Sequence, residues 1–130
     1  MITLAFCTHN PTAELYLYNG TTLLEKYSWT AHRELSVTIH QKIDQLLHNN
    51  QLQLSSLGGI IFYEGPGSFT GLRIGVAVAN ALASALGIPI VASGGEDWLK
   101  TGLGAIKDQK NFSAVAPIYG SEAVITQPKK

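Results

Sequence analysis

The segment from Gly65 to Gly75, GPGSFTGLRIG, constrains the fold of this 130-residue chain more than any other stretch. A short apolar run at 59–63 precedes it, and a helical pattern of small and apolar residues at 72–86 follows it. Glycine permits positive φ angles and close backbone approach, whereas proline fixes φ and removes a hydrogen-bond donor. The segment therefore predicts a tight turn between a buried strand and a helix, an arrangement whose free backbone N–H groups can bind an anion.

Three enzyme motifs built on glycine-rich turns do not fit this segment. A Walker A loop ends in glycine followed by lysine, and no lysine is present here. A nucleophile elbow needs glycine two residues before and after its serine, but Pro66 and Thr70 occupy those positions around Ser68. The dinucleotide-binding spacing G-x-G-x-x-G starts correctly at Gly65 and fails at Thr70.

The rest of the chain predicts a single α/β unit. Alternating apolar residues indicate strands, spacings of three and four residues indicate helices, and an Asn-Gly-Thr turn indicates a hairpin. The expected elements are strands at 2–6, 15–18 and 22–27, a helix at 33–48, a strand at 59–63, a helix at 70–86, a strand at 88–92 and a helix at about 95–106. The first three strands should form an antiparallel meander, to which crossover helices add two parallel strands.

The glycine-rich segment resembles the signature of the bacterial TsaB (YeaZ) family, a subunit in the synthesis of threonylcarbamoyladenosine in tRNA. The similarity runs in unbroken order over roughly residues 1–100, through the strand at 2–6, the helix start at 33–36 and the helix-to-strand passage at 86–93. It implies a ribonuclease H-like (actin-like ATPase) lobe in the α/β class, with a five-stranded mixed sheet and the element order βββαβαβ.

The resemblance also implies partners. First-lobe helices of the family bundle with TsaD, the actin-like subunit that performs threonylcarbamoyl transfer, and they self-associate as a homodimer when TsaD is absent. A TsaE-like ATPase is the further expected partner. The loop motif comprises Gly65, Pro66, Gly67, Ser68, Phe69, Thr70 and Gly71. The partner interface carried over by the resemblance comprises Leu35, Ile39, Lys42, Leu72, Arg73, Val76, Ala77 and Asn80.

The helix at 72–86 gives an independent argument for a docking surface, because it is apolar around most of its circumference. We expect its sheet-facing side to contain Ile74, Val78, Ala81, Leu82 and Ala85. A second apolar side contains Leu72, Val76, Ala79, Ala83 and Leu86. Between the two sides run Arg73, Ala77, Asn80 and Ser84. A two-layer domain leaves this outer side uncovered, and small residues let another helix approach closely. The alternative is burial against the first helix of the same chain.

Composition favours a protein-binding domain of the reducing cytoplasm. Nine acidic and nine basic residues balance, so we expect tRNA to be contacted only indirectly, because direct phosphate binding usually needs a basic surplus. The lone cysteine, Cys7, excludes an internal disulfide. No signal-peptide pattern precedes the first strand, and no apolar run is long enough to span a membrane.

Two departures from the family pattern modify these expectations. Cys7–Thr8 stands where the family's first strand usually ends in an aspartate, an acid that helps hold the metal in actin-like enzymes. We therefore expect no catalytic residue, cofactor or metal, and a pseudo-enzyme role.

The chain is too short to hold the family's second lobe, yet the segment at 116–119 resembles the family's C-terminal P-x-Y element. We expect one domain at 1–130, with a tail at about 110–130 and the second lobe absent.

Three other functions stay open on the residues alone. A ribonuclease H-like nuclease needs clustered acids, and the candidates Glu14, Glu64, Glu96 and Asp97 are mostly away from the central strand ends. A small ATP-binding actin-like module with its own nucleotide site is the main alternative. A protease acting on a partner is the third, although no Ser/His/Asp arrangement is visible in the sequence.

Overall fold

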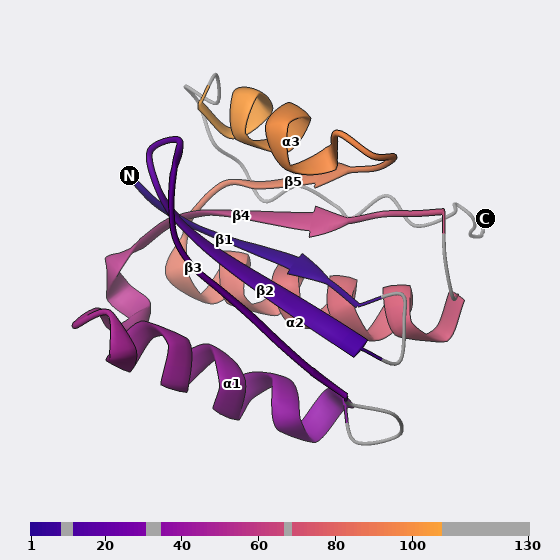
Figure 1. Cartoon of the computed structure of the whole chain (residues 1–130), viewed down its shortest axis with the longest axis horizontal. Coiled ribbons are helices and arrows are strands. Elements are labelled where there is room, and N and C mark those ends of the chain that lie inside the picture. The colour runs from indigo at the N-terminus through magenta and orange to yellow at the C-terminus, as the bar shows by residue number, and fades with distance from the viewer. Residues whose placement is uncertain (9–11, 31–34, 67–68, 108–130) are drawn as a thin grey trace.

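A five-stranded sheet with helices on both faces organises the chain (Figure 1). The computed structural model describes residues 1–8, 12–30, 35–66 and 69–107. The strands are β1 (Ile2–Cys7), β2 (Thr12–Asn19), β3 (Thr22–Thr30), β4 (Leu57–Tyr63) and β5 (Ile90–Ser93). The helices are α1 (Leu35–Asn49), the short 3₁₀ helix η2 (Leu54–Ser56), α2 (Phe69–Leu86) and α3 (Trp98–Lys107).

The predicted topology is confirmed. The strand order is β3-β2-β1-β4-β5. β1 pairs antiparallel with β2, and β2 with β3, whereas the β1–β4 and β4–β5 pairs are parallel. The hairpin strands are longer than predicted, because their ladder continues to the Thr12–Thr30 pair. β5 starts two residues later than predicted, because Gly87 (φ 68°) ends α2 and the Ile88 N–H bonds the Ala83 carbonyl (3.0 Å).

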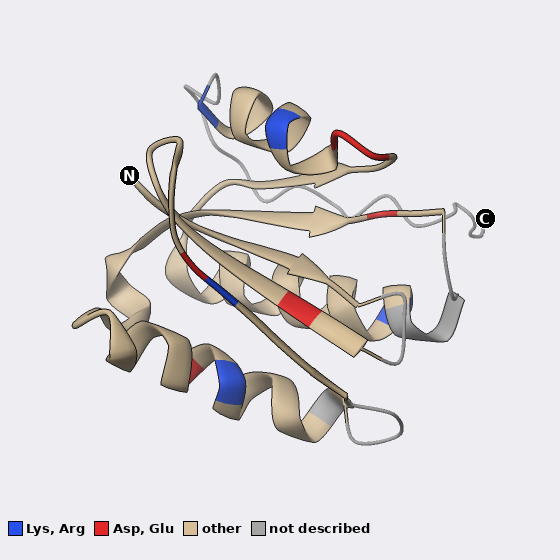
Figure 2. Ribbon diagram, in the orientation of Figure 1, with Lys and Arg blue, Asp and Glu red and all other residues tan. Residues whose placement is uncertain are grey.

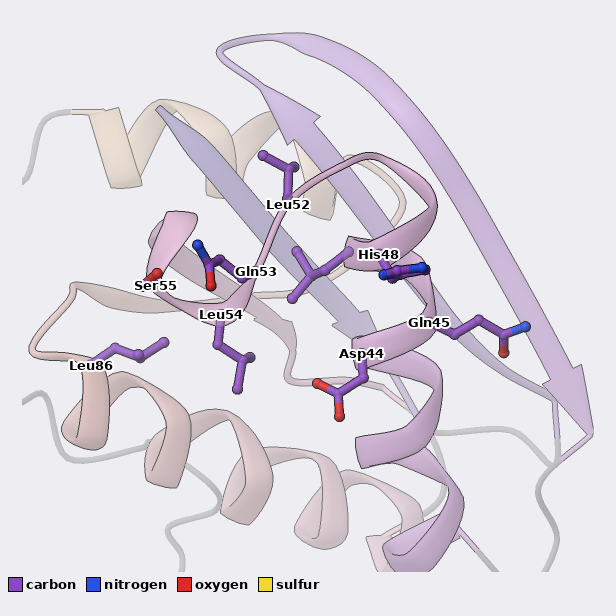
Figure 3. Close-up of a pocket in the computed structure, with 9 residues that line it drawn as sticks. Asp44, Gln45, His48, Leu52, Gln53, Leu54, Ser55 and Leu86 are labelled. Atoms are coloured by element: carbon purple, nitrogen blue, oxygen red, sulfur yellow. The ribbon is translucent and has the colours of Figure 1, made fainter.

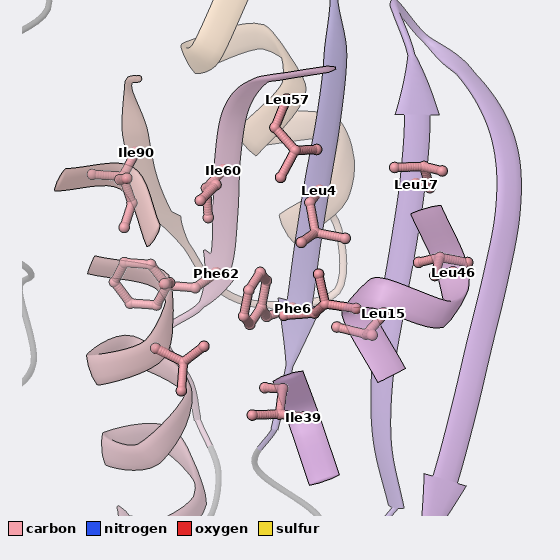
Figure 4. Close-up of a cluster of buried hydrophobic side chains, with 14 of the residues drawn as sticks. Leu4, Phe6, Leu15, Leu17, Ile39, Leu46, Leu57, Ile60, Phe62 and Ile90 are labelled. Carbon is pink, nitrogen blue, oxygen red and sulfur yellow. The ribbon is translucent and has the colours of Figure 1, made fainter. Parts of the chain in front are cut away.

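The larger core lies between the sheet and the pair α1 and α2, which cover the same face (Figure 1). Alternate residues of β1, β2 and β4 point into this core, as strand geometry requires. The side of α1 that packs against them consists of Leu35, Ile39, Ile43, Leu46 and Leu47. The labelled core residues of Figure 4 are Leu4, Phe6, Leu15, Leu17, Ile39, Leu46, Leu57, Ile60, Phe62 and Ile90.

The opposite face of the sheet carries α3, so the expectation of a two-layer domain was wrong (Figure 1). A second core forms there, and Trp98 is its largest side chain. The Trp98 ring meets Tyr16 and Tyr63 edge-on, with centroid separations of 5.6 and 5.5 Å. Burial on both faces explains why β1 and β4 are nearly continuous apolar runs rather than alternating ones.

The orientation predicted for α2 was wrong in part. Val76 and Ala83, which were expected on the outer apolar side, are 2% exposed in the core, whereas Ala81 and Ala85 are exposed. The cause is the close approach of α2 to β1. A side chain at Gly75 would collide with the Thr8 hydroxyl, so this helix position must lie against the sheet. The rest of the helix is rotated accordingly.

The close packing of α3 generates a stability prediction. A Cβ at Gly102 would lie 2.5 Å from Cγ2 of Ile61, which is fully buried and branched at Cβ, whereas a Cβ at Gly104 meets nothing within 4 Å. Gly102→Ala should therefore lower the free energy of unfolding by about 1–3 kcal/mol through overpacking. Gly104→Ala on the same helix should raise it by about 0.5–1 kcal/mol. Urea unfolding measures both, and equal effects would show that α3 does not pack as described.

Candidate functional site

The turn that begins the glycine-rich segment is bonded to the turn after β5. The Gly95 N–H donates to the Gly65 carbonyl (3.1 Å), and the Glu64 N–H donates to the Ser93 carbonyl (2.9 Å). A Cβ at Gly94 would lie 2.5 Å from the Gly65 carbonyl oxygen, so the two backbones pack without room for a side chain. Our sequence reasoning missed this second turn, although two glycines following a strand were a usable signal.

The remainder of the loop motif can be placed only in part. The Tyr63 hydroxyl donates to the carbonyl of Pro66 (2.6 Å), which fixes the start of the segment. Gly67 and Ser68 lie outside the described residues, as do Arg33 and the segments at 110–130 and 116–119. Phe69, Thr70 and Gly71 form the first turn of α2, in agreement with the predicted strand–turn–helix arrangement.

The carboxyl end of β1, where actin-like enzymes place an acid, is occupied by a buried thiol. Cys7 is 5% exposed and pairs with Glu14 of β2. The Glu14 carboxylate accepts a hydrogen bond from the Tyr16 hydroxyl (2.8 Å) and lies 3.6 Å from the Lys26 amine. In the described part of the chain, no three His, Cys, Asp or Glu side chains are grouped to hold a metal ion.

Burial, together with the hydrogen bond to Glu14, raises the pKa of Tyr16 well above its ordinary value of 10.0. The Lys26 amine lies 5.4 Å from the centre of the same ring. These contacts keep the phenol protonated and the carboxylate engaged within the fold. The cluster therefore ties β2 to β3.

The most exposed surface of α2 is a row of small residues. The small residues are Ala77, Ala81, Ser84 and Ala85, with Arg73 at the start of the row, and we call these five residues the outer face of α2. Asn80 lies half-buried at its margin. Arg73, near the start of the helix, is the one charged residue of α2 (Figure 2). Of the strip predicted between the two apolar sides of this helix, all residues except the half-buried Asn80 are thus exposed. Ala81 and Ala85 are exposed beside them.

Three residues assigned to the partner interface are in the chain's own core, so that part of the assignment was wrong. Leu35, Ile39 and Val76 are 4, 0 and 2% exposed, because the apolar stripe of α1 and the inner side of α2 face the sheet. Lys42 is half-buried against β3, where its amine donates to the Tyr27 hydroxyl (3.1 Å). Leu72 and Asn80 are also half-buried, which leaves Arg73 and Ala77 as the exposed members on α2.

An open groove of about 770 Å³ lies between the C-terminal half of α1, η2 and the end of α2 (Figure 3). Its apolar wall consists of Leu47, Leu52, Leu54 and Leu86. Polar side chains, among them Asp44 and His48, line the α1 side. We did not predict this groove, because η2 has no helical or strand periodicity; the alternating Leu52 and Leu54 were the only sequence signal.

Comparison with known proteins agrees with the fold and with the glycine-rich segment. Residues 29–93 match the family model described as TsaD, tRNA N6-adenosine threonylcarbamoyltransferase. The tRNA threonylcarbamoyladenosine biosynthesis protein TsaB of Bacillus subtilis (strain 168) is 36% identical over 92 residues, which are 71% of this chain and 40% of that protein. The chain belongs to the TsaB family.

Other TsaB relatives and solved structures support this assignment. TsaB of Escherichia coli (strain K12) is 29% identical over 88 residues, covering 68% of this chain and 38% of that protein. YeaZ from Pseudomonas aeruginosa superposes with a TM-score of 0.66 at 29% identity, covering 72% of this chain and 43% of that one. Thermus thermophilus RuvC (TM-score 0.51, 14% identity) shares the ribonuclease H-like fold alone. The chain thus spans well under half of the TsaB proteins it matches.

Alkaline unfolding tests the environment of Tyr16. The unfolded chain loses this proton near pH 10, whereas the folded protein retains it, so the stabilisation is present below that pH and is lost as pH rises further. The free energy of unfolding should fall progressively as pH rises above about 10, and Tyr16→Phe should make that fall shallower. Chemical denaturation at several pH values measures the slope. Identical slopes in both proteins would contradict the buried phenol.

Proposed function

We propose that this TsaB-family chain supports the formation of threonylcarbamoyladenosine in tRNA as a non-catalytic subunit that docks on a TsaD-like catalytic subunit. The family membership supports the pathway, and the match of residues 29–93 to the TsaD family model supports a relationship with that subunit. Because the chain spans 40% of its Bacillus subtilis relative, the activity and partners of the whole relative are proposals here.

The outer face of α2 is the observation that carries this proposal. The helix is firmly packed on its inner side, yet it presents Ala77, Ala81 and Ala85 to solvent at successive spacings of four residues. Residues four apart form a ridge along a helix, and small ridges allow interhelical distances near the lower end of the usual ~8–10 Å range. Such a surface, with one charge at its start, is suited to a second helix rather than to a nucleic acid.

The non-catalytic role is supported by the residues at the carboxyl ends of the strands. The fold family implies a magnesium–nucleotide site at this edge of the sheet. Magnesium prefers oxygen ligands in an octahedral arrangement, and the side chain at the end of β1 is the buried thiol of Cys7. The carboxylate of Glu14, which pairs with Cys7 across the β1–β2 ladder, is held by Tyr16 and Lys26. These residues do not fit the metal, so we derive no catalytic step from them.

The proposal also includes a second copy of the chain, a TsaE-like ATPase and tRNA. Without a TsaD-like subunit, we propose that two copies of the chain associate through α1 and α2, because apolar helix surface favours association. A TsaE-like ATPase completes the complex, tRNA is bound through the other subunits, and the complex works in the cytoplasm. Among the described residues, no helix is long and apolar enough to cross a membrane. The single-lobe organisation stays a prediction.

A charge placed on the outer face of α2 should abolish docking. Ala77→Glu introduces a carboxylate that would be desolvated between two helices at a cost of several kcal/mol. Ala105→Glu is the matched control, because Ala105 is also an exposed alanine of a helix but lies on the other face of the sheet. Calorimetric titration with the TsaD-like subunit of the same organism should show binding for the wild-type chain and the control, and none for Ala77→Glu.

Circular dichroism must show that both variants keep the fold. In a reaction mixture with the TsaD-like and TsaE-like subunits, the threonylcarbamoyl precursor and tRNA, the Ala77→Glu chain should no longer support the formation of threonylcarbamoyladenosine. Wild-type affinity and activity in that variant would show that the docking surface lies elsewhere on the molecule. Loss of binding in both glutamate variants would point to a nonspecific effect of the added charge.

A further inference from the structure

Three of the four large apolar side chains that are exposed in the described part of the chain gather at one end of the sheet. They are Met1, Leu23 and Leu24, which are 58, 45 and 40% exposed. The two leucines follow the turn of the β2–β3 hairpin, and the Gly20 N–H in that turn donates to the Met1 carbonyl (2.9 Å). The N-terminus therefore lies beside the hairpin (Figure 1), and we call the three side chains the hairpin-end patch.

The patch extends onto the face of the sheet that carries α3. Leu23 pairs with Tyr18 across the β2–β3 ladder, and side chains directly opposite one another in a ladder share a face. Tyr18 belongs to the core beneath α3. Leu23 therefore lies on the α3 face of the sheet, away from the outer face of α2.

The last turn of α3 ends beside the same patch. A Cβ placed on Gly59 of β4 would lie 2.7 Å from Cγ1 of Ile106 and 3.6 Å from Sδ of Met1, so these two side chains approach the same point. Ile106 is followed by Lys107, the last residue of α3. The chain therefore leaves α3 next to Met1, and residues 108–130 follow from there, outside the described part.

An apolar stretch of that following segment is within reach of the patch. Residues 112–119, FSAVAPIY, are apolar or aromatic except for Ser113. From Lys107 to Val115 an extended chain reaches up to about 26 Å at ~3.3 Å per residue. The strands β1 and β3 are two strand spacings apart, or about 10 Å. The length of chain after α3 is therefore sufficient to bring this stretch across the patch.

We propose that residues 112–119 of the chain itself cover the hairpin-end patch. A segment tethered next to its site meets it at an effective concentration in the millimolar range, so a few apolar contacts suffice. A separate protein suits the patch less well, because three partly exposed side chains offer far less than the about 800 Å² per partner that a stable interface buries. This contact is independent of docking through α2, so it does not rest on the proposed function.

Methyl NMR of the full chain tests this inference. Nuclear Overhauser contacts should connect the methyl groups of Ile118 with those of Leu23 and Leu24. Val37 is the control, because it is the fourth exposed apolar side chain, is 65% exposed and belongs to α1. No contact should join Ile118 to Val37. Absence of contacts between Ile118 and both leucines would overturn the inference.

Two aspartate variants and a mixed-label sample identify the occupant of the patch. Ile118→Asp should shift the methyl resonances of Leu23 and Leu24, whereas Ile125→Asp, later in the same segment, should leave them in place. A shift in Ile125→Asp alone would assign the patch to another part of the segment and overturn the inference. In a mixture of differently labelled chains, the contacts should arise within one molecule. Contacts found only between molecules would place a second copy on the patch, which also overturns it.

Discussion

The close packing of α2 on the parallel strands is the constraint on which the rest of the molecule depends. At Gly75 the helix lies so near β1 that the Thr8 hydroxyl occupies the place of a side chain. This contact sets the rotation of the helix, sends Val76 and Ala83 into the core and turns Ala77 outward. The outer face of α2 is therefore a consequence of how its inner face packs.

The backbones also pack closely, without room for a side chain, at the carboxyl ends of β4 and β5. The turn at Gly65 and the turn at Gly94 and Gly95 share a backbone hydrogen bond, and a Cβ at Gly94 would strike the Gly65 carbonyl. The glycine-rich segment continues into α2, which begins at Phe69 and whose exposed face is the proposed docking surface.

The order and direction of the elements could be predicted from the sequence, because strand and helix periodicities are local properties. The rotation of α2 could not, since a helix apolar on most sides gives no pattern that distinguishes Ala81 from Ala83. The contact between Gly75 and Thr8 decides it, and that contact is tertiary. For α1 the sequence pattern was informative, because Leu35 and Ile39 belong to its single apolar stripe, and the family resemblance misplaced them at a partner interface. The groove beside Leu52 and Leu54 could not be predicted, because these residues lie in a short irregular segment.

Cross-saturation NMR of the isotope-labelled chain bound to an unlabelled TsaD-like subunit tests the central claim most directly, because it reports which residues lie against the partner. The account predicts strong saturation transfer to Ala77, Ala81 and Ala85 on the outer face of α2, and little transfer to Ala105 on α3. Transfer concentrated on α3, with Ala77 and Ala81 unaffected, would contradict it.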